Sequence, residues 1–250
     1  MRVAALNDIH GNLPALEEVL REVRQAKVDR VVVGGDVVPG PMVRETLTCL
    51  ADLDIPTEFI QGNGEVAVLS HMWGAEPQWY RTVPADAREI VRWQAEQLPE
   101  YKELFSSWPM TLRLDIPGLG GVLFCHATPR DENECFTRLT SDDRLRPVFE
   151  GLDVAIVVCG HTHMQFDRSI CGIRVVNAGS VGMPFGRTGA DWLLLGPDVQ
   201  LRHTVYDLAA AAERFQSTKY PQAQQLADRY ILNPPSEAEM LEVFSKAELT

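Results

Sequence analysis

The sequence predicts an α/β fold whose sheet is largely parallel in the N-terminal part. Three consecutive units, each an apolar run followed by a polar turn and a helical stretch, occupy the first seventy residues. The apolar runs cover residues 2–6, 30–33 and 57–60. Successive β-α units of one sheet are joined by right-handed crossovers, which leave their strands parallel. The repetition therefore favours a parallel sheet with helices packed against it.

A helix is predicted after the first strand. The polar turn of residues 7–12 precedes it, and Pro14 lies in its first turn, where a missing N–H leaves no hydrogen bond unmade. The second and third units repeat this order, with polar turns at residues 34–36 and 61–65. The apolar residues of the first helix recur at helical spacing, as Leu13, Leu16, Val19, Leu20 and Val23.

Later strands are predicted mostly in pairs. Short turns containing glycine separate two pairs of β runs, which is typical of hairpins, and these pairs cover residues 111–115 with 121–125 and 165–170 with 173–176. Between the hairpins we expect a helix at residues 141–149 and a buried strand at 154–159. Two further strands, at 192–195 and 199–202, complete the sheets.

We expect a single domain over residues 1–250, because no linker or low-complexity run divides the chain. The segment 66–108 reads as an insertion of about three helices separated by prolines, and residues 207–250 as a helical C-terminal tail. The insertion is rich in aromatic residues, which favours the interpretation that these side chains pack in the core. Alternatively, segment 66–108 forms a flap over a site or a contact between two copies of the chain. The sequence leaves open whether the protein is a homo-oligomer.

The charge balance limits the choice of partners. The formal charge of −12, from 23 Lys and Arg against 35 Asp and Glu, argues against an extended nucleic-acid surface, because phosphate backbones are bound by positive charge. A small phosphate-ester substrate stays compatible, since divalent cations reverse the sign locally.

We expect a cytoplasmic protein with no membrane segment. Residues 1–6 lead straight into a polar motif and leave no room for the apolar core of a signal peptide. No apolar run approaches eighteen residues. The five cysteines lack Cys-x-x-Cys spacing and are odd in number, which fits reduced thiols.

Polar residues with metal-binding side chains follow strand after strand. The apolar run of residues 154–159 ends at Gly160-His161-Thr162-His163. Other predicted strands end in the same way, and ligands of α/β sheets collect at the carboxyl ends of strands. Carboxylates and imidazoles without thiolates suit borderline cations, and seven donors are too many for one tetrahedral zinc but fit two ions. The seven candidates are Asp8, His10, Asp36, Asn63, His126, His161 and His163.

These motifs, in this order, resemble those of the calcineurin-like metallophosphoesterase superfamily over residues 2 to about 205. The stretches 8–12 and 177–182 are similar to its small prokaryotic phosphodiesterase branch. The resemblance implies a four-layer α/β/β/α sandwich of two mixed sheets with a dinuclear centre. It also implies that Asp36 bridges two metals held by two sets of three ligands: Asp8, His10 and His163 for one, and Asn63, His126 and His161 for the other.

The resemblance implies hydrolysis of phosphodiesters or nucleotide-like phosphates, by in-line attack of a hydroxide that the two metals share. Asp36, Asn63 and His126 would hold the hydroxide and the phosphate. Mn²⁺ is the first choice of metal, with Fe, Zn²⁺, Ni, Co or Mg²⁺ as alternatives. A protein Ser/Thr phosphatase and a dinucleoside polyphosphate hydrolase are alternative functions. A non-catalytic scaffold is a further alternative, although all seven ligand positions are retained.

One position departs from the superfamily pattern. Many members read Gly-Asn-His-Glu where this chain has Gly62-Asn63-Gly64-Glu65, so the histidine thought to act on the leaving group is absent. His71 on the following helix is a candidate substitute, with an ordinary surface histidine as the alternative. Arg187, in a glycine-rich loop, is a candidate phosphate clamp, because a guanidinium binds phosphate bidentately, with a solvated loop arginine as the alternative.

Overall fold

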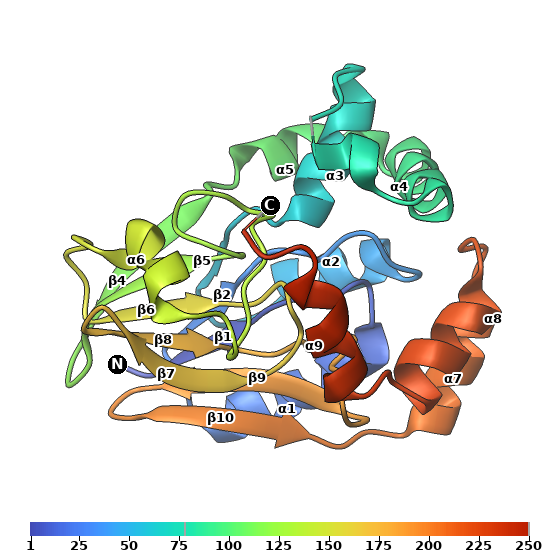
Figure 1. Cartoon of the computed structure of the whole chain (residues 1–250). Coiled ribbons are helices and arrows are strands. Elements are labelled where there is room, and N and C mark those ends of the chain that lie inside the picture. Colours follow the sequence, from blue (N-terminus) through green and yellow to red (C-terminus); the bar gives the residue numbers. More distant parts are fainter. Residues whose placement is uncertain (78, 250) are drawn as a thin grey trace.

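The computed structural model describes residues 1–77 and 79–249, and within them the strands form two five-stranded sheets (Figure 1). The first sheet has the order β10-β9-β1-β2-β3, with β1 Val3–Leu6, β2 Arg30–Val33, β3 Thr57–Phe59, β9 Ala190–Leu195 and β10 Val199–Thr204. The second has the order β4-β5-β6-β8-β7, with β4 Thr111–Ile116, β5 Gly120–Cys125, β6 Ile156–Cys159, β7 Phe166–Ile170 and β8 Ile173–Asn177.

Each sheet combines three neighbouring parallel strands with two strands that join by antiparallel pairing. In the first sheet β1 pairs in parallel with β2, and β2 with β3, whereas β9 and β10 are antiparallel. In the second, β6 pairs in parallel with β5 and β8, and the outer strands β4 and β7 are antiparallel. The two predicted hairpins, β4 with β5 and β7 with β8, are thereby confirmed. The largely parallel arrangement predicted for the N-terminal part holds for β1, β2 and β3.

The alternation of side chains along the strands builds two sides of each sheet. In β1, Val3 and Ala5 join the apolar cluster between the two sheets, and Ala4 and Leu6 join the cluster on the outer side. The second sheet behaves in the same way. Ile156 and Val158 of β6 face the first sheet, and Val157 and Cys159 face outward. Both sheets are therefore covered on both faces, as strands that are apolar throughout require.

Helices cover the two outer faces. On the first sheet lie α1 (Leu13–Gln25) and α2 (Val43–Ala51), and on the second lies α6 (Asp142–Phe149). The start of α1 follows the local signals in the sequence, because the side chain of Asn12 accepts a hydrogen bond from the Ala15 N–H and Pro14 needs no partner. The predicted four-layer α/β/β/α sandwich is confirmed.

Two helical groups stand beside the sandwich. The segment after β3 contains α3 (Asn63–Trp73), α4 (Ala85–Gln97) and α5 (Lys102–Ser107), with 3-10 turns at Trp79–Thr82 and Pro99–Tyr101. The C-terminal segment contains α7 (Leu208–Gln216), α8 (Ala223–Leu226), the π-helical turn Ala227–Leu232 and α9 (Glu237–Ser245). Figure 1 shows the first group above the sheets and the second beside them. In the part of the chain that is described, no helix has the length and hydropathy of a membrane span.

Candidate metal centre

The seven residues predicted as ligands all lie where strands of the two sheets end. Asp8 and His10 follow β1, and Asp36 follows β2. Asn63 is the first residue of α3, which follows β3. From the second sheet come His126, after β5, and His161 and His163, after β6. Because the parallel strands of both sheets end at one side of the sandwich, residues more than 150 positions apart in sequence meet there.

The first group consists of Asp8, His10 and His163. The Nε2 atoms of the two imidazoles are 3.3 Å apart. The Oδ1 atom of Asp8 lies 3.2 Å from Nε2 of His163 and 4.0 Å from Nε2 of His10. All three residues are buried, and their donor atoms are close enough together to surround one ion.

The second group contains Asn63, His126 and His161, with Asp36 beside them. The Oδ1 atom of Asn63 lies 3.0 Å from Nε2 of His126 and 2.9 Å from Nδ1 of His161. Asp36 reaches both groups, because its Oδ1 is 3.5 Å from Nε2 of His126 and its Oδ2 is 3.7 Å from Nε2 of His10. Asp8 also approaches this group, with Oδ1 3.8 Å from Nε2 of His126.

Backbone carbonyl groups fix the orientation of three of the rings. The Nδ1 atoms of His10, His126 and His163 lie 3.2, 2.9 and 2.8 Å from the carbonyl oxygens of Pro39, Gly34 and Met183 respectively. A carbonyl oxygen only accepts, so each Nδ1 donates its proton, and the neutral ring presents an unprotonated Nε2 to the centre. This is the arrangement in which metal-binding histidines are held by a second hydrogen bond.

One carboxylate oxygen shows that these residues fit a cation. The Oδ1 atom of Asp8 is buried and has no hydrogen-bond partner among the described residues. It faces the Nε2 atoms of His10, His126 and His163, which carry no proton when these rings are neutral. A buried acceptor without a donor is strongly unfavourable, and a cation among these atoms would satisfy all of them.

In the metal-free chain, burial and neighbouring ionisable groups shift the pKa values of the proposed ligands. Burial works against ionisation of Asp8, but the neighbouring imidazoles outweigh it and hold the pKa of its carboxyl well below the usual range. For Asp36 burial prevails and raises the pKa to about 7. Burial lowers the pKa of both His10 and His161 to about 3, so these rings are neutral at physiological pH.

The other two histidines titrate in the opposite direction. Burial opposes the charged forms of His126 and His163, yet nearby carboxylates outweigh this effect and raise the pKa of each ring. For His126 these carboxylates are Asp36 and Asp8, and for His163 the nearest is Asp8. Without a metal, a proton on these rings would therefore relieve the contacts between unpartnered acceptors.

Comparison with known proteins agrees with this geometry. Residues 1–196 match the model of the calcineurin-like phosphoesterase superfamily domain. The chain belongs to this superfamily. It is also 25% identical, over 242 residues, to an uncharacterized protein of Methanocaldococcus jannaschii, and the match covers 88% of this chain and 94% of the relative.

Two solved structures share the fold of this phosphoesterase-superfamily chain. A hypothetical protein from Pyrococcus horikoshii has a TM-score of 0.74 at 20% identity, with 94% of this chain and 99% of the other covered. A metallophosphoesterase from Sphaerobacter thermophilus has a TM-score of 0.69 at 24% identity, with 92% and 97% covered. Because each likeness covers more than 90% of this chain, both extend beyond residue 196.

The backbone at the centre of this superfamily member is strained. Five of the seven predicted ligands have a positive φ, between 48° and 64°, and they are Asp8, His10, Asp36, His161 and His163. Such a conformation costs about 1–3 kcal/mol for a residue with a side chain, and it persists only where the surroundings impose it. The strained positions are those of side chains that meet at the centre, and no local sequence signal reveals the strain.

Glu65 supports the centre and was not given a role by the sequence. Its buried carboxylate accepts hydrogen bonds from the backbone N–H groups of Asp36, Val37 and Val38, at 2.8 to 3.2 Å, and from Gly62 at 2.8 Å. The loop that carries Asp36 is therefore tied to the first turn of α3. The available signal was the spacing from Gly62 to Glu65, which is that of a capping box.

Gly64 occupies the position where many superfamily members have histidine. Its N–H donates to Oδ1 of Asp36 at 2.7 Å. A Cβ atom on Gly64 would lie 2.0 Å from the carbonyl oxygen of Val38 and 2.9 Å from Oδ1 of Asp36. The backbone therefore has no room for a side chain here, which gives the missing histidine a structural reason.

The two additional candidates lie outside the group. Arg187 donates to Oδ1 of Asp191 at 2.6 Å and to Oε1 of Gln165 at 2.9 Å, so its guanidinium already has partners within the protein. Nε2 of His71 lies 2.9 Å from the hydroxyl of Tyr80. Neither Arg187 nor His71 is among the described residues that line the cavity over the centre. This geometry supports neither the phosphate clamp nor the substitute acid.

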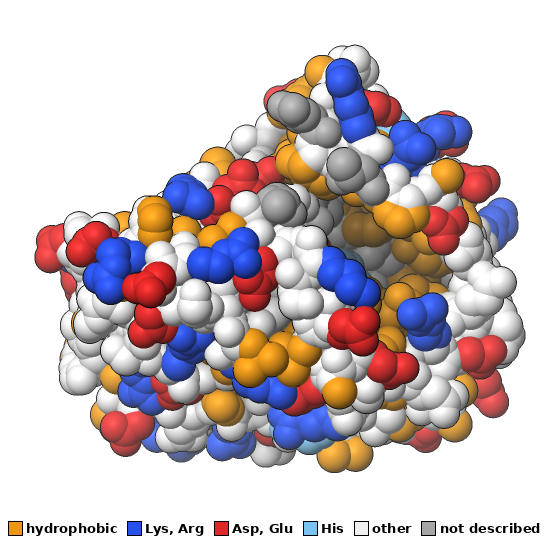
Figure 2. All heavy atoms as spheres, viewed as in Figure 1, with side chains coloured by type: hydrophobic (Ala, Val, Ile, Leu, Met, Phe, Trp, Pro, Cys, Tyr) orange, Lys and Arg blue, Asp and Glu red, His pale blue; other side chains and the backbone are white. Residues whose placement is uncertain are grey.

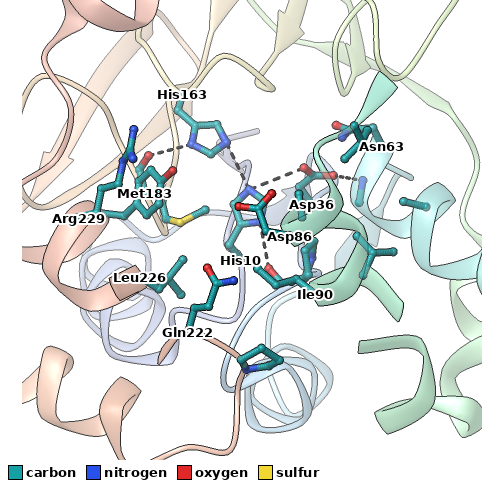
Figure 3. Close-up of a pocket in the computed structure, with 18 of the residues that line it drawn as sticks. His10, Asp36, Asn63, Asp86, Ile90, His163, Met183, Gln222, Leu226 and Arg229 are labelled. Atoms are coloured by element: carbon teal, nitrogen blue, oxygen red, sulfur yellow. Dashed lines mark hydrogen bonds and ion pairs between the residues drawn. The ribbon is translucent and has the colours of Figure 1, made fainter. Parts of the chain in front are cut away.

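A cavity of about 820 Å³ opens over the proposed ligands. Figure 3 shows His10, Asp36, Asn63 and His163 together at one end of it. Residues of α3, α4 and the turn between them form one wall, and the C-terminal helices with the loop after β8 form the other. Figure 2 shows the hollow on one face of the molecule, with hydrophobic side chains inside it.

Proposed function

We propose that this protein is a metal-dependent phosphoesterase that hydrolyses phosphodiesters or nucleotide-like phosphates. The observation that carries the proposal is the convergence of imidazole Nε2 atoms and the unpartnered Oδ1 of Asp8 on one buried point at the end of a cavity. Such a set of donors binds borderline divalent cations, and Mn²⁺ is our first choice.

Two ions would be held by residues from both sheets. Asp8, His10 and His163 would bind one ion, and Asn63, His126 and His161 the other. The two oxygens of Asp36 point to different groups, which suits a bridging carboxylate. When bound, the ions would supply an activated water molecule and neutralise charge on the phosphate.

The residues that line the cavity determine which leaving groups the enzyme would favour. Of the described residues that line the cavity, the histidines are His10, His161 and His163, all of them proposed ligands. No further imidazole stands ready to protonate a departing oxygen. An alkyl leaving group should therefore react about 10²–10⁴-fold more slowly than if an acid were present. Esters with acidic leaving groups, such as aryl phosphates and phosphoanhydrides, should suffer less.

The test uses an aryl phosphodiester. Protein loaded with Mn²⁺ should hydrolyse bis(p-nitrophenyl) phosphate, and the Asp36→Ala variant should lose this activity, because the oxygens that reach both groups are gone. Asp115→Ala is the matched control, since the side chain of Asp115 on β4 is 83% exposed. Full activity in Asp36→Ala would exclude the proposed two-metal centre.

A further inference from the structure

We propose that the cavity recognises a planar aromatic ring on the phosphate ester and holds it between the insertion and the C-terminal helices. This inference rests on the proposed phosphoesterase function. A phosphate group alone does not account for a cavity of about 820 Å³, which is the size of the sites that bury ligands of several rings. Most of the lining comes from segments 66–108 and 207–249, which carry none of the superfamily motifs, and the loop after β8 adds Met183 and Phe185.

The insertion contributes an apolar wall with a fixed aromatic ring. Tyr80 is almost completely buried, and its hydroxyl is engaged by Nε2 of His71 at 2.9 Å and by the carbonyl oxygen of Arg88 at 3.3 Å. The polar end of this side chain is therefore satisfied within the protein. Val83, just before α4, and Ile90 of α4 continue the wall.

The opposite wall begins at a proposed metal ligand. The ring of Phe185 stacks on the imidazole of His163, with centroids 5.0 Å apart and an angle of 17°. Phe244 of α9 and Tyr230 lie beyond it, with centroids 6.2 and 6.4 Å from that of Phe185. Apolar surface thus extends from the centre itself to the C-terminal helices, where Leu226 adds to it. A ring attached to a phosphate at the centre would therefore contact this apolar surface directly.

The far end of the C-terminal segment is anchored. The N–H of Leu249 donates to the carbonyl oxygen of Cys135 at 2.8 Å, and the carboxylate of Glu248 accepts from the hydroxyl of Thr140 at 2.8 Å. Glu248 also pairs with Arg144. These contacts fasten the chain after α9 to the second sheet side of the molecule, so the wall is preformed rather than a loose tail.

The charges of the lining favour an uncharged ring. Arg229 is the single Lys or Arg among the described lining residues, whereas the carboxylates of Asp86 and Asp228 also face the cavity. Figure 3 shows Arg229 and Gln222 on the C-terminal side and Asp86 and Ile90 on the other. A large anionic group would meet as much repulsion as attraction, while amides and carboxylates around an apolar middle suit a ring with polar edges.

Binding to three phosphorus compounds tests the inference. Titration calorimetry with the full chain loaded with Mn²⁺ compares methylphosphonate, phenylphosphonate and uridine 5′-monophosphate. We expect phenylphosphonate to bind roughly ten- to a hundredfold more tightly than methylphosphonate, because its ring is removed from water between the walls. Uridine 5′-monophosphate binding more tightly than phenylphosphonate would identify a nucleoside as the source of the ring, and the reverse order would identify a plain aryl ester.

Two variants test whether the cavity walls cause the tighter binding of phenylphosphonate. Ile90→Ala on α4 and Leu226→Ala on α8 should each weaken phenylphosphonate binding about three- to tenfold and leave methylphosphonate binding unchanged. Leu104→Ala is the matched control, because Leu104 lies in the same insertion, is 43% exposed and does not line the cavity.

The outcomes separate the two proposals. Equal affinity for phenylphosphonate and methylphosphonate overturns the ring site and leaves the phosphoesterase intact. Absence of binding by both compounds in the Mn²⁺-loaded protein overturns the phosphoesterase itself, and the ring site with it.

Discussion

The Oδ1 atom of Asp8 lies 3.2 Å from Nε2 of His163, although neither atom has a proton of its own to share when the ring is neutral. The Nδ1 proton of His163 is committed to the carbonyl oxygen of Met183, and Oδ1 of Asp8 is buried without a donor. Two acceptors at this distance repel one another unless a proton or a cation joins them. The close approach of Asp8 and His163 therefore depends on a proton or a cation bound between them.

Asp8→Asn should disable the first metal site. The amide would keep the shape of the side chain but remove the negative charge next to His163 and His10. We expect metal affinity to fall at least about a hundredfold, since even residues that only orient ligands are worth 10–100-fold. Elemental analysis after dialysis gives the number of ions per chain. Asp153→Asn, at a fully exposed position, is the control, and an unchanged metal content in Asp8→Asn would contradict this assignment.

Metal binding should release protons below neutral pH. In the metal-free chain the pKa of Asp36 is raised by burial to about 7, so its carboxyl holds a proton over most of the acidic range. His10 and His161 have pKa values lowered by burial to about 3, so they are already neutral there and release none. His126 and His163, whose pKa values nearby carboxylates raise, add to the protons that a metal displaces. Protons that compete with a metal lower its affinity, so the affinity should rise with pH, most clearly through about 7, where Asp36 ionises.

Calorimetry in buffers of different ionisation enthalpy counts these protons. The number released should be larger at about pH 6 than at about pH 8, where Asp36 is ionised before the metal arrives. Asp36→Asn serves as the comparison, because it should remove one releasable proton at the lower pH. A count that stays constant between the two values would mean that Asp36 is ionised in the metal-free chain.

Much of the fold and the ligand set could be predicted because their signals are local. Apolar runs followed by polar turns reveal the strand ends, and Gly160-His161-Thr162-His163 reveals two donors after one of them. The cavity could not be predicted, because its walls come from segments more than 90 residues apart that meet only through packing. The ion pair of Arg187 could not be predicted for a similar reason: its partner Asp191 is buried at the start of β9, a burial that the sequence does not show.

Glu65→Gln should destabilise the protein and weaken the centre together. The carboxylate accepts four backbone N–H groups, and an amide would turn its own N–H₂ toward some of these donors. Hydrogen bonds to charged groups contribute about 1.5–3 kcal/mol each, so the free energy of unfolding should fall by about 2–4 kcal/mol. Urea denaturation measures the change, with Glu89→Gln on the exposed side of α4 as the control.

The metal content of the same variant distinguishes a loss of metal-site positioning from a general loss of folding stability. Because Glu65 holds the N–H groups of Asp36, Val37 and Val38, its loss should lower Mn²⁺ affinity even under conditions where the variant is fully folded. Full metal binding by folded Glu65→Gln would show that the loop carrying Asp36 keeps its position without the carboxylate.

Gly64→His should fail to create a general acid, although it restores the sequence that many superfamily members carry. The added Cβ would lie 2.0 Å from the carbonyl oxygen of Val38, and the N–H of Gly64 is needed by Asp36. Overpacking of this kind costs about 1–3 kcal/mol, and the loop must move to accept it. We therefore expect lower stability and no gain in turnover of p-nitrophenyl phosphate. Gly64→Ala carries the same clash without an imidazole and should behave alike, so a stable Gly64→His with monoesterase activity well above that of Gly64→Ala would show that the loop of residues 36–38 yields.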